Sequence, residues 1–431
     1  MKCRSLLAVG LSAAAALPAS ASAYPRGHHD PPASADAVLH WNAIAQREVV
    51  PPAPGVAQPQ PTSMSSMAFV QAAVYNAVVA IRGGYEPYGR GVARQRGASV
   101  DAAVATAAHG VLVHYFPARA GQLDADLTAA LEDIPAGRAK RRGAAVGRTA
   151  AQRLINSRAG DGWLADIGFT MPAPAPGVWR LDAGQAPLVP WLSRLRPFTL
   201  RRPDQFRPGP PPRLGSPEYA AAFNEVKDFG RIDSTVRTPE QTLYAVWWLE
   251  FAETSVNRLA RQLATQRRTH LWQASRMFAL LNMSLYDAYI ANLDSKYEYN
   301  HWRPYTAIRQ AALDGNPATV ADANWEPLRT TPPFPEYVSG HATGTAATMN
   351  ILERTFGGKV SFTMDSMTAP PGMPTRSFRS FKAAAAECAD SRVRVGFHFR
   401  YATDRGLIQG RAVAGWLEEN YLEFRRGSQK D

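Results

Sequence analysis

Apolar residues recur at three- and four-residue spacing along most of this chain, and that spacing places them on one face of a helix. Alternating runs rich in valine, isoleucine and threonine, which are typical of strands, are nearly absent. The sequence therefore predicts an all-α protein. The helical pattern covers residues 63–81, 100–115, 120–134 and 143–155, resumes at 216, and continues through 240–263 and 270–293.

A long segment without helical periodicity separates two groups of helices. Residues 158–217 contain the stretches MPAPAPGVW and FRPGPPP together with several large aromatic residues. A flexible linker would be polar, so we expect this segment to wrap around the protein surface. We predict two packed helical bundles, at 24–157 and 218–431, joined by this irregular connection. Its aromatic residues are Trp163, Trp179, Trp191, Phe198 and Phe206.

The first 23 residues have the layout of a secretory signal peptide. Lys2 and Arg4 precede an apolar stretch, and small residues lead up to a cleavage site near Ala23. No later run is long and apolar enough to span a bilayer. We therefore expect a secreted or periplasmic protein without a stable membrane anchor. Its mature form would keep one cysteine, Cys388, which excludes an internal disulfide bond.

The net charge of +12 over 431 residues is compatible with an anionic substrate or cofactor, an anionic surface or a nucleic acid. The densest basic run, RAKRR at residues 138–142, lacks the interleaved aromatic residues of a nucleic-acid site. We interpret this run as the solvated face of a helix and expect no nucleic-acid partner. The sequence leaves open whether the chain forms a homo-oligomer.

The segment KYEYNHWRP, residues 296–304, carries the first candidate functional motif. Lys296 and Arg303 are seven residues apart, close to two helical turns, so we expect both side chains on the same side of one element. Pro304 marks the point where regular helical hydrogen bonding is interrupted. Two cations held together suit an oxyanion, although a solvated basic helix face would show the same pattern.

Two further motifs follow along the chain. Ser339, Gly340 and His341 open a helix-like stretch, where a serine N-cap and exposed backbone N–H groups favour anion binding. Arg392 and His398 lie six residues apart in SRVRVGFH. Each motif alone has a structural interpretation, as a helix cap or as a packed core histidine. Together the three motifs supply cations, backbone donors and two histidines, a set that suits an oxyanion passing through five-coordinate geometry.

The order K-x6-RP, SGH, SR-x5-H resembles the signature shared by vanadium-dependent haloperoxidases and the type 2 phosphatidic acid phosphatase superfamily, which includes bacterial class A acid phosphatases. The motifs span residues 296–398, and in combination they are highly specific. More weakly, the whole chain resembles the exported bacterial haloperoxidase branch, through its TPPFPEY and FRPGPPP stretches. Small acid phosphatases lack the long N-terminal helical half.

This resemblance implies that vanadate is the cofactor and that phosphate can occupy the same site. His398 would be the vanadium ligand, His341 the acid–base group, and Lys296 the group that activates the peroxide. Phe334, seven residues before His341, matches an aromatic residue that lines the halide side. The implied substrates are hydrogen peroxide, a halide and a small organic acceptor. The residues expected to hold the vanadate oxygens are Lys296, Arg303, Ser339, Gly340 and Arg392.

Two other functions remain open on the sequence. A secreted acid phosphatase would use His398 as the phosphorylated nucleophile and His341 to protonate the leaving group. A non-catalytic protein would bind phosphate or vanadate without turnover. Phosphatases of this type have an aspartate four residues after the nucleophilic histidine, whereas this chain has Ala402, and the nearest acid is Asp404. We favour the haloperoxidase because of Ala402 and the long N-terminal half.

Overall fold

The computed structural model describes residues 34–49, 62–163, 165–181 and 184–425. The predicted signal peptide lies outside these residues, so its cleavage and the export of the protein stay predictions. From Ser34 onward the chain forms one compact unit. The division into bundles at 24–157 and 218–431 also stays a prediction.

The described residues confirm the all-α fold class. They form thirteen α-helices, four short 3₁₀ helices and one antiparallel pair of strands, β1 (Phe362–Asp365) and β2 (Thr375–Phe378). The helices are α1 (Asp36–Val49), α2 (Thr62–Arg82), α3 (Val100–Tyr115), α4 (Ala120–Glu132), α5 (Arg138–Arg158), α6 (Pro217–Gly230), α7 (Pro239–Trp247), α8 (Ala252–Gln266), α9 (Leu271–Tyr299), α10 (Pro304–Arg309), α11 (Gly340–Phe356), α12 (Phe381–Arg394) and α13 (Arg400–Asn420).

The helical pattern in the sequence predicts α2, α3, α4 and α9 closely but treats α7 and α8 as one run. The structure breaks that run between Trp247 and Ala252, because Phe251 adopts an extended backbone with φ −78° and ψ 150°. Glu250, within the break, is buried and pairs with Arg258 nearly two turns into α8. The break matters for function, because Leu249 and Phe251 line the candidate site.

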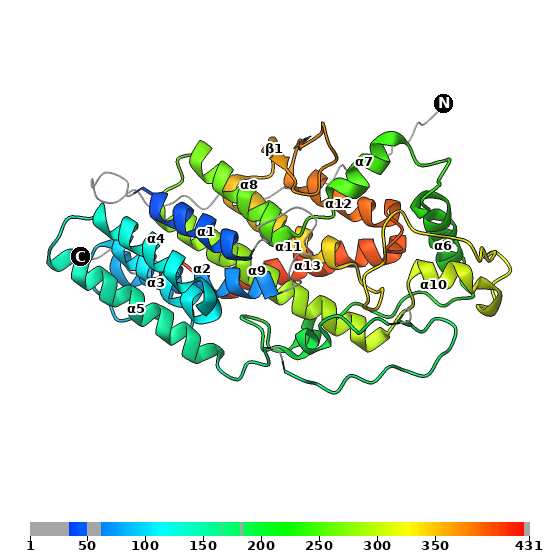
Figure 1. The fold of residues 1–431 in the computed structure, drawn as a ribbon, viewed down its shortest axis with the longest axis horizontal. Helices are drawn as coiled ribbons and strands as arrows, with labels where there is room; N and C mark the ends of the chain where they lie inside the picture. Colours follow the sequence, from blue (N-terminus) through cyan, green and yellow to red (C-terminus); the bar gives the residue numbers. More distant parts are fainter. Residues whose placement is uncertain (1–33, 50–61, 164, 182–183, 426–431) are drawn as a thin grey trace, which may run out of the picture. The chain divides into compact units, whose positions relative to one another are not determined.

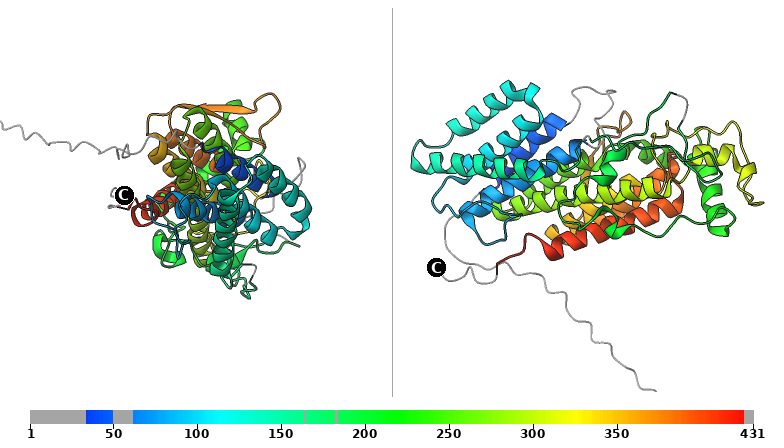
Figure 2. Two further views of the ribbon diagram at one scale, coloured as in Figure 1. Left: turned by 90° about the vertical axis from the view of Figure 1, so that its left-hand side faces the viewer. Right: turned by 90° about the horizontal axis from the view of Figure 1, so that it is seen from below.

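Helix α9 is the central element of the fold. It contacts α2 from the N-terminal half and α11 and α13 from the C-terminal half, and these helices surround it in two views (Figures 1 and 2). Nearly every residue from Ala274 to Lys296 is buried. A helix that is buried all round must satisfy its polar side chains internally, and α9 does so with Asn282 and Asp287.

The proline-rich segment is fixed onto α9 by specific polar contacts. The backbone N–H groups of residues 198–200 donate to the carboxylate of Asp287, at N···O distances of 2.6, 2.8 and 3.2 Å. Arg207 forms a bidentate ion pair with Asp294, one N–O pair at 2.7 Å and the other at 2.9 Å. Trp179 is buried, and its backbone N–H donates to the carbonyl of Asn300 just beyond the helix. This segment therefore packs against the length of α9 and is not a free linker.

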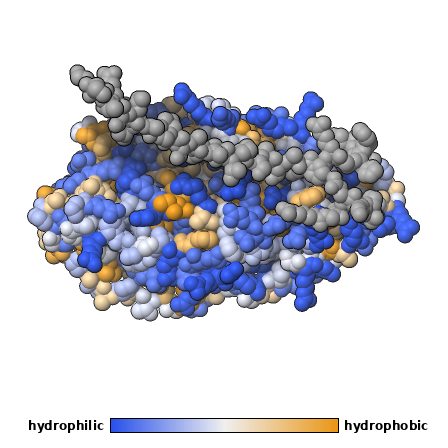
Figure 3. Space-filling view, turned by 180° about the vertical axis from the view of Figure 1, so that it is seen from behind, coloured by the Kyte–Doolittle hydropathy of each residue, from blue (hydrophilic) through white to orange (hydrophobic). Residues whose placement is uncertain are grey.

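Seen from behind, the surface is mostly hydrophilic, with small apolar areas scattered among the polar residues (Figure 3). No helix among the described residues is long and apolar enough to cross a membrane. Cys388 is fully buried in α12, and burial raises the pKa of its thiol to about 11. It therefore acts as a packed side chain and not as a site of pairing between molecules.

Candidate active site

Lys296 and Arg303 meet in space, but they do not project from one element as the sequence predicts. Helix α9 ends before Asn300, whose left-handed backbone (φ 45°) caps the helix and turns the chain. Pro304 then opens α10 instead of ending a helix. Both cations still lie over the ring of Phe334, with the Lys296 Nζ 4.9 Å and the Arg303 Cζ 4.7 Å from its centroid.

Lys296 is almost completely buried on the last turn of α9. Its Nζ donates to the carbonyl oxygens of Pro335 and Glu336, both at 2.9 Å. An ammonium group has three N–H donors, so one remains for a ligand. Burial and then the neighbouring Arg303 hold the pKa of Lys296 well below its usual range. An anion in the pocket would offset both effects and stabilise the charged form.

The two arginines of the motifs each have one buried nitrogen without a protein partner. The Nη2 of Arg303 and the Nη1 of Arg392 donate no hydrogen bond to any described residue. Both side chains are buried, and burial lowers the pKa of each guanidinium to about 10. Leaving a buried charged donor unpaired is costly, by roughly 1–3 kcal/mol or more. The donor set therefore fits a tetrahedral oxyanion such as vanadate or phosphate.

The second motif forms the first turn of α11, as the sequence predicts. Ser339 is the N-cap, and its Oγ accepts from the N–H of Ala342 at 3.5 Å. The N–H groups that follow at Gly340 and His341 precede the helix's own hydrogen bonds and lie at its positive end. A side chain at Gly340 would approach the Oδ1 of Asn292 to 3.3 Å, so glycine keeps this end of the helix open.

His341 is held in one tautomer by the backbone of the break between α7 and α8. Its Nε2–H donates to the carbonyl of Leu249 at 3.3 Å, and its ring packs on Phe251 at a centroid distance of 4.9 Å. Since a carbonyl only accepts, Nδ1 of the neutral ring is the free base. Burial, followed by the charge of Arg392, holds the pKa of His341 well below its usual range. The ring is therefore held neutral, with Nδ1 unprotonated.

His398 is also held in one tautomer, by a partner that the sequence analysis missed. Its Nδ1 lies 2.9 Å from the Oε1 of Glu336, while its Nε2 lies 3.2 Å from the Nη1 of Arg303. A guanidinium only donates, so Nε2 carries the lone pair and Nδ1–H donates to the carboxylate. Burial first, then Arg303, lowers the pKa of His398 well below its usual range. This tautomer leaves Nε2 available as a ligand or nucleophile.

Glu336 is fully buried in the TPPFPEY stretch, five residues before His341. Its Oε1 also accepts from the N–H of Phe399, and its Oε2 has no partner among the described residues. Burial raises the pKa of Glu336 to about 8, against the opposing effect of Lys296 and Arg303. Asp404, the acid nearest to Ala402 in the sequence, is exposed. An acid within an apolar, proline-rich lead-in was the signal that could have identified Glu336.

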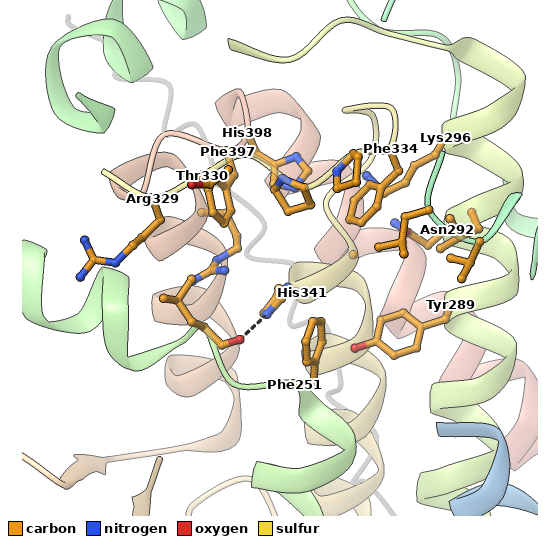
Figure 4. A pocket seen from close by; sticks show the side chains of 18 of the residues that line it. Phe251, Tyr289, Asn292, Lys296, Arg329, Thr330, Phe334, His341, Phe397 and His398 are labelled. Carbon is orange, nitrogen blue, oxygen red and sulfur yellow. Dashed lines mark hydrogen bonds between the residues drawn. The ribbon is translucent and has the colours of Figure 1, made fainter. Parts of the chain in front are cut away.

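These residues surround one pocket with a volume of about 500 Å³. His341 lies at its centre, with His398 and Lys296 on one side and Tyr289 and Phe251 on the other (Figure 4). Arg303 and Ser339 do not line the pocket itself, although Arg303 contacts His398 directly. The predicted site residues that line it are Lys296, Phe334, Gly340, His341, Arg392 and His398.

Comparisons with known proteins point to one group of enzymes. Residues 276–427 match the family described as the VCPO second helical-bundle domain. A stretch of 232 residues is 27% identical to the vanadium chloroperoxidase of Curvularia inaequalis, and it covers 39% of this chain and 37% of that enzyme. The chain resembles the vanadium-dependent haloperoxidases in sequence. The resemblance predicted from the three motifs is thereby confirmed.

Solved haloperoxidases share the fold of nearly the whole chain. A bacterial vanadium-dependent iodoperoxidase superposes with a TM-score of 0.74 at 24% identity, over 92% of this chain and 99% of that one. A holo-type bacterial vanadium-dependent chloroperoxidase gives a TM-score of 0.73 at 18% identity, over 91% and 98%. At these identities the match establishes a shared fold. The three motifs and Glu336 all lie within the stretch that matches the haloperoxidase family.

Proposed function

We propose that this protein is a vanadate-dependent haloperoxidase, which uses hydrogen peroxide to oxidise a halide to hypohalous acid. The observation that carries the proposal is the unprotonated Nε2 of His398 close to two buried guanidinium nitrogens that have no partner among the described residues. The family match supports the assignment. The overall reaction combines hydrogen peroxide, a halide ion and a proton, and it yields hypohalous acid and water.

Five groups would hold the oxygens of vanadate: Arg303, Arg392, Lys296, Ser339 and the Gly340 N–H. His398 would be the single protein ligand through Nε2. When bound, vanadate supplies a Lewis-acidic centre that makes hydrogen peroxide susceptible to attack by a halide without any change in oxidation state. Repulsion among the buried cations is relieved by an anion of more than one negative charge.

In this proposal His341 accepts a proton, and Lys296 stabilises the negative charge that develops during the reaction. Nδ1 of His341 is the free base, because Nε2 is engaged by Leu249, and it accepts the proton of the incoming hydrogen peroxide. Lys296, with one N–H left for a ligand, stabilises the negative charge that develops on the oxygen leaving as water. Phe334 fixes this ammonium group from the side and forms the adjacent apolar wall, where a halide would approach.

The first experiment compares two activities of the chain from Tyr24, stripped of phosphate, with and without orthovanadate. One assay supplies hydrogen peroxide, bromide, chloride or iodide and a halogen-trapping dye, and the other supplies a chromogenic phosphate monoester. We expect halogenation that depends on vanadate. Release of phosphate that vanadate inhibits, without halogenation, would overturn the proposal.

A phosphatase is the second candidate, and one observation favours keeping it. In the sequence, Ala402 stands where phosphatases have an aspartate, and this argues against phosphatase chemistry. In the structure, Glu336 supplies a carboxylate for His398 from another segment. In this reaction Nε2 of His398 would attack phosphorus, and His341 would protonate the leaving group. The lowered pKa of His341 keeps the ring neutral, the form that accepts a proton, whereas protonating a leaving group requires the charged form, and this favours the haloperoxidase.

A further inference from the structure

We propose that Asn292 makes this pocket selective for protonated oxyanions, because its side-chain oxygen accepts a hydrogen bond from an O–H of the bound anion. The proposal rests on the anion site of the proposed function, but not on the oxidation of a halide. It applies to hydrogen phosphate as well as to hydrogen vanadate, and it disfavours an anion without a hydrogen, such as sulfate.

The amide of Asn292 is fixed in one orientation. Asn292 lines the pocket one turn before Lys296, and it lies between Lys296 and Tyr289 on the α9 side (Figure 4). Its Nδ2 donates to the carbonyl of Val338 at 3.0 Å and to the Oγ1 of Thr343 at 3.3 Å. Since a carbonyl only accepts, the nitrogen of the amide must face Val338, and this determines where Oδ1 lies.

The Oδ1 of Asn292 has no hydrogen-bond partner among the described residues. The side chain is fully buried, so bulk solvent does not replace the missing partner. A buried acceptor without a donor destabilises a protein, and a group that donates to it removes this cost. A ligand with an O–H would therefore gain affinity from Asn292, whereas a ligand with acceptors alone would be repelled by its oxygen.

Gly340 leaves an open space beside this oxygen. A Cβ atom at Gly340 would lie 3.3 Å from the Oδ1 of Asn292. Apart from nearby backbone of the same helix and the adjoining residues, only the Asn292 side chain lies within 4 Å of that point. A small shift from this distance gives an O–H···O hydrogen bond of the usual length, about 2.7–2.8 Å. An oxygen of an anion at the N-terminus of α11 can therefore donate to Asn292.

The surrounding cations and backbone groups only donate. Lys296 keeps one N–H for a ligand, and Arg392 has a buried nitrogen without a partner among the described residues. Deprotonated oxygens suit these donors, and one protonated oxygen suits Asn292, so a hydrogen-bearing oxyanion satisfies both kinds of group.

Asn292 differs from the two histidines of the pocket in one respect. The free nitrogens of His341 and His398 also accept, but an imidazole can gain a proton and become a donor. An amide oxygen stays an acceptor at every pH in the physiological range. A site built around a fixed acceptor rejects the analogue that lacks the O–H, because the buried partner stays unpaired. Asn292 is therefore the residue that selects for the hydrogen of the anion.

Selectivity is tested on the chain from Tyr24, stripped of phosphate, by calorimetric titration at pH 8. Hydrogen phosphate and sulfate then have the same shape and the same double negative charge, so they differ by one hydrogen. We expect phosphate to bind about 10–100-fold more tightly than sulfate. Equal affinities of the wild-type protein for the two anions would overturn the proposal.

Three variants distinguish selection from a structural role. Asn292→Leu removes the acceptor, so phosphate affinity should fall about tenfold while sulfate affinity does not fall. Asn292→Asp keeps an acceptor and should keep the preference for phosphate, although its charge weakens both anions. Asn224→Leu is the control, at an exposed asparagine on α6 whose Nδ2 also donates to a backbone carbonyl. Equal losses for both anions in Asn292→Leu, or no preference in Asn292→Asp, would contradict selection by Asn292.

Halogenation by the wild-type protein separates this inference from the proposed function. Equal binding of phosphate and sulfate, together with vanadate-dependent halogenation, would refute the role of Asn292 and leave the haloperoxidase intact. A preference for phosphate over sulfate that is lost in Asn292→Leu, without any halogenation by the wild type, would refute the haloperoxidase and leave the role of Asn292 intact.

Discussion

Two buried charged sites lie along α9, and they differ in how completely the protein satisfies them. The carboxylate of Asp287 accepts four hydrogen bonds, three of them from the backbone of residues 198–200. Near the end of α9, Lys296 lies close to Arg303 and Arg392, and each of these arginines keeps a buried nitrogen without a partner among the described residues. A satisfied buried charge holds the structure together, whereas an unsatisfied one is held in place for a ligand.

The strongest test of this comparison removes the ligand atom from the unsatisfied site. His398→Ala should lower vanadate affinity at least about 100-fold, equivalent to about 2.8 kcal/mol, because the only protein–vanadium bond is lost. Equilibrium dialysis of vanadate against both proteins measures the change. His114→Ala, at an exposed histidine on α3, is the matched control and should bind as the wild type does. Unchanged affinity in His398→Ala would remove the residue from the site.

At the satisfied site, around Asp287, we expect a substitution to lower stability and not vanadate affinity. Asp287→Ala leaves three backbone donors of residues 198–200 buried without an acceptor, so the free energy of unfolding should fall by roughly 3 kcal/mol. Asp287→Asn keeps one acceptor oxygen, so its free energy of unfolding should fall less. Urea denaturation gives the stabilities, and dialysis at a temperature where the variant is folded gives the vanadate affinity. A large loss of vanadate affinity in Asp287→Ala without a loss of stability would contradict this distinction between the two sites.

The sequence predicted the unsatisfied site better than the satisfied one. The motif residues share fixed spacings, so Lys296, Ser339, His341 and Arg392 could be named before any geometry was known. Asp287 could not, because its partners lie 87–89 residues earlier in a segment without periodicity. Glu336 was missed for a related reason, since its pairing with His398 spans 62 residues. Spacing reports contacts along one element, and contacts between distant segments depend on packing.

The path from Lys296 to Arg303 shows the same limit on a smaller scale. A spacing of seven residues fits two turns of one helix, yet the left-handed backbone of Asn300 ends α9 first. The two side chains nevertheless meet at Phe334 because the chain folds back. Helix periodicity therefore identified the elements and the residues, but not the turn that brings the residues together.

Glu336 combines both conditions of this comparison, since one of its oxygens accepts hydrogen bonds and the other has no partner among the described residues. Glu336→Ala should weaken vanadate binding by about 10–100-fold, because His398 loses the partner that fixes its tautomer. Glu336→Gln keeps an acceptor oxygen, so its vanadate affinity should fall less.

Dialysis gives the affinities of both variants, and the ¹⁵N chemical shifts of the imidazole report the tautomer directly. Glu326→Gln, at an exposed position, is the control. Wild-type affinity together with a wild-type tautomer in Glu336→Ala would show that the carboxylate does not position His398.

His301 extends the comparison to a buried group that the protein satisfies in its neutral form. Its Nε2 lies 2.7 Å from the hydroxyl of Tyr401, and burial lowers its pKa from 6.5 to about 3. The folded protein therefore binds fewer protons than the unfolded chain, so stability is full above pH 6.5 and falls as the pH drops from 6.5 toward 3. At pH 5 the loss from this residue is roughly 2 kcal/mol.

His301→Gln keeps a polar partner for Tyr401 but does not titrate. Urea denaturation at pH 7 and pH 5 should therefore show a loss of stability on acidification that is about 2 kcal/mol smaller in the variant. All other titrating groups are common to both proteins, so they cancel in the difference. The same pH dependence in both proteins would mean that His301 gains a proton without leaving its site. A neutral, satisfied group should affect only stability, so vanadate affinity at pH 7 should be the same in both proteins.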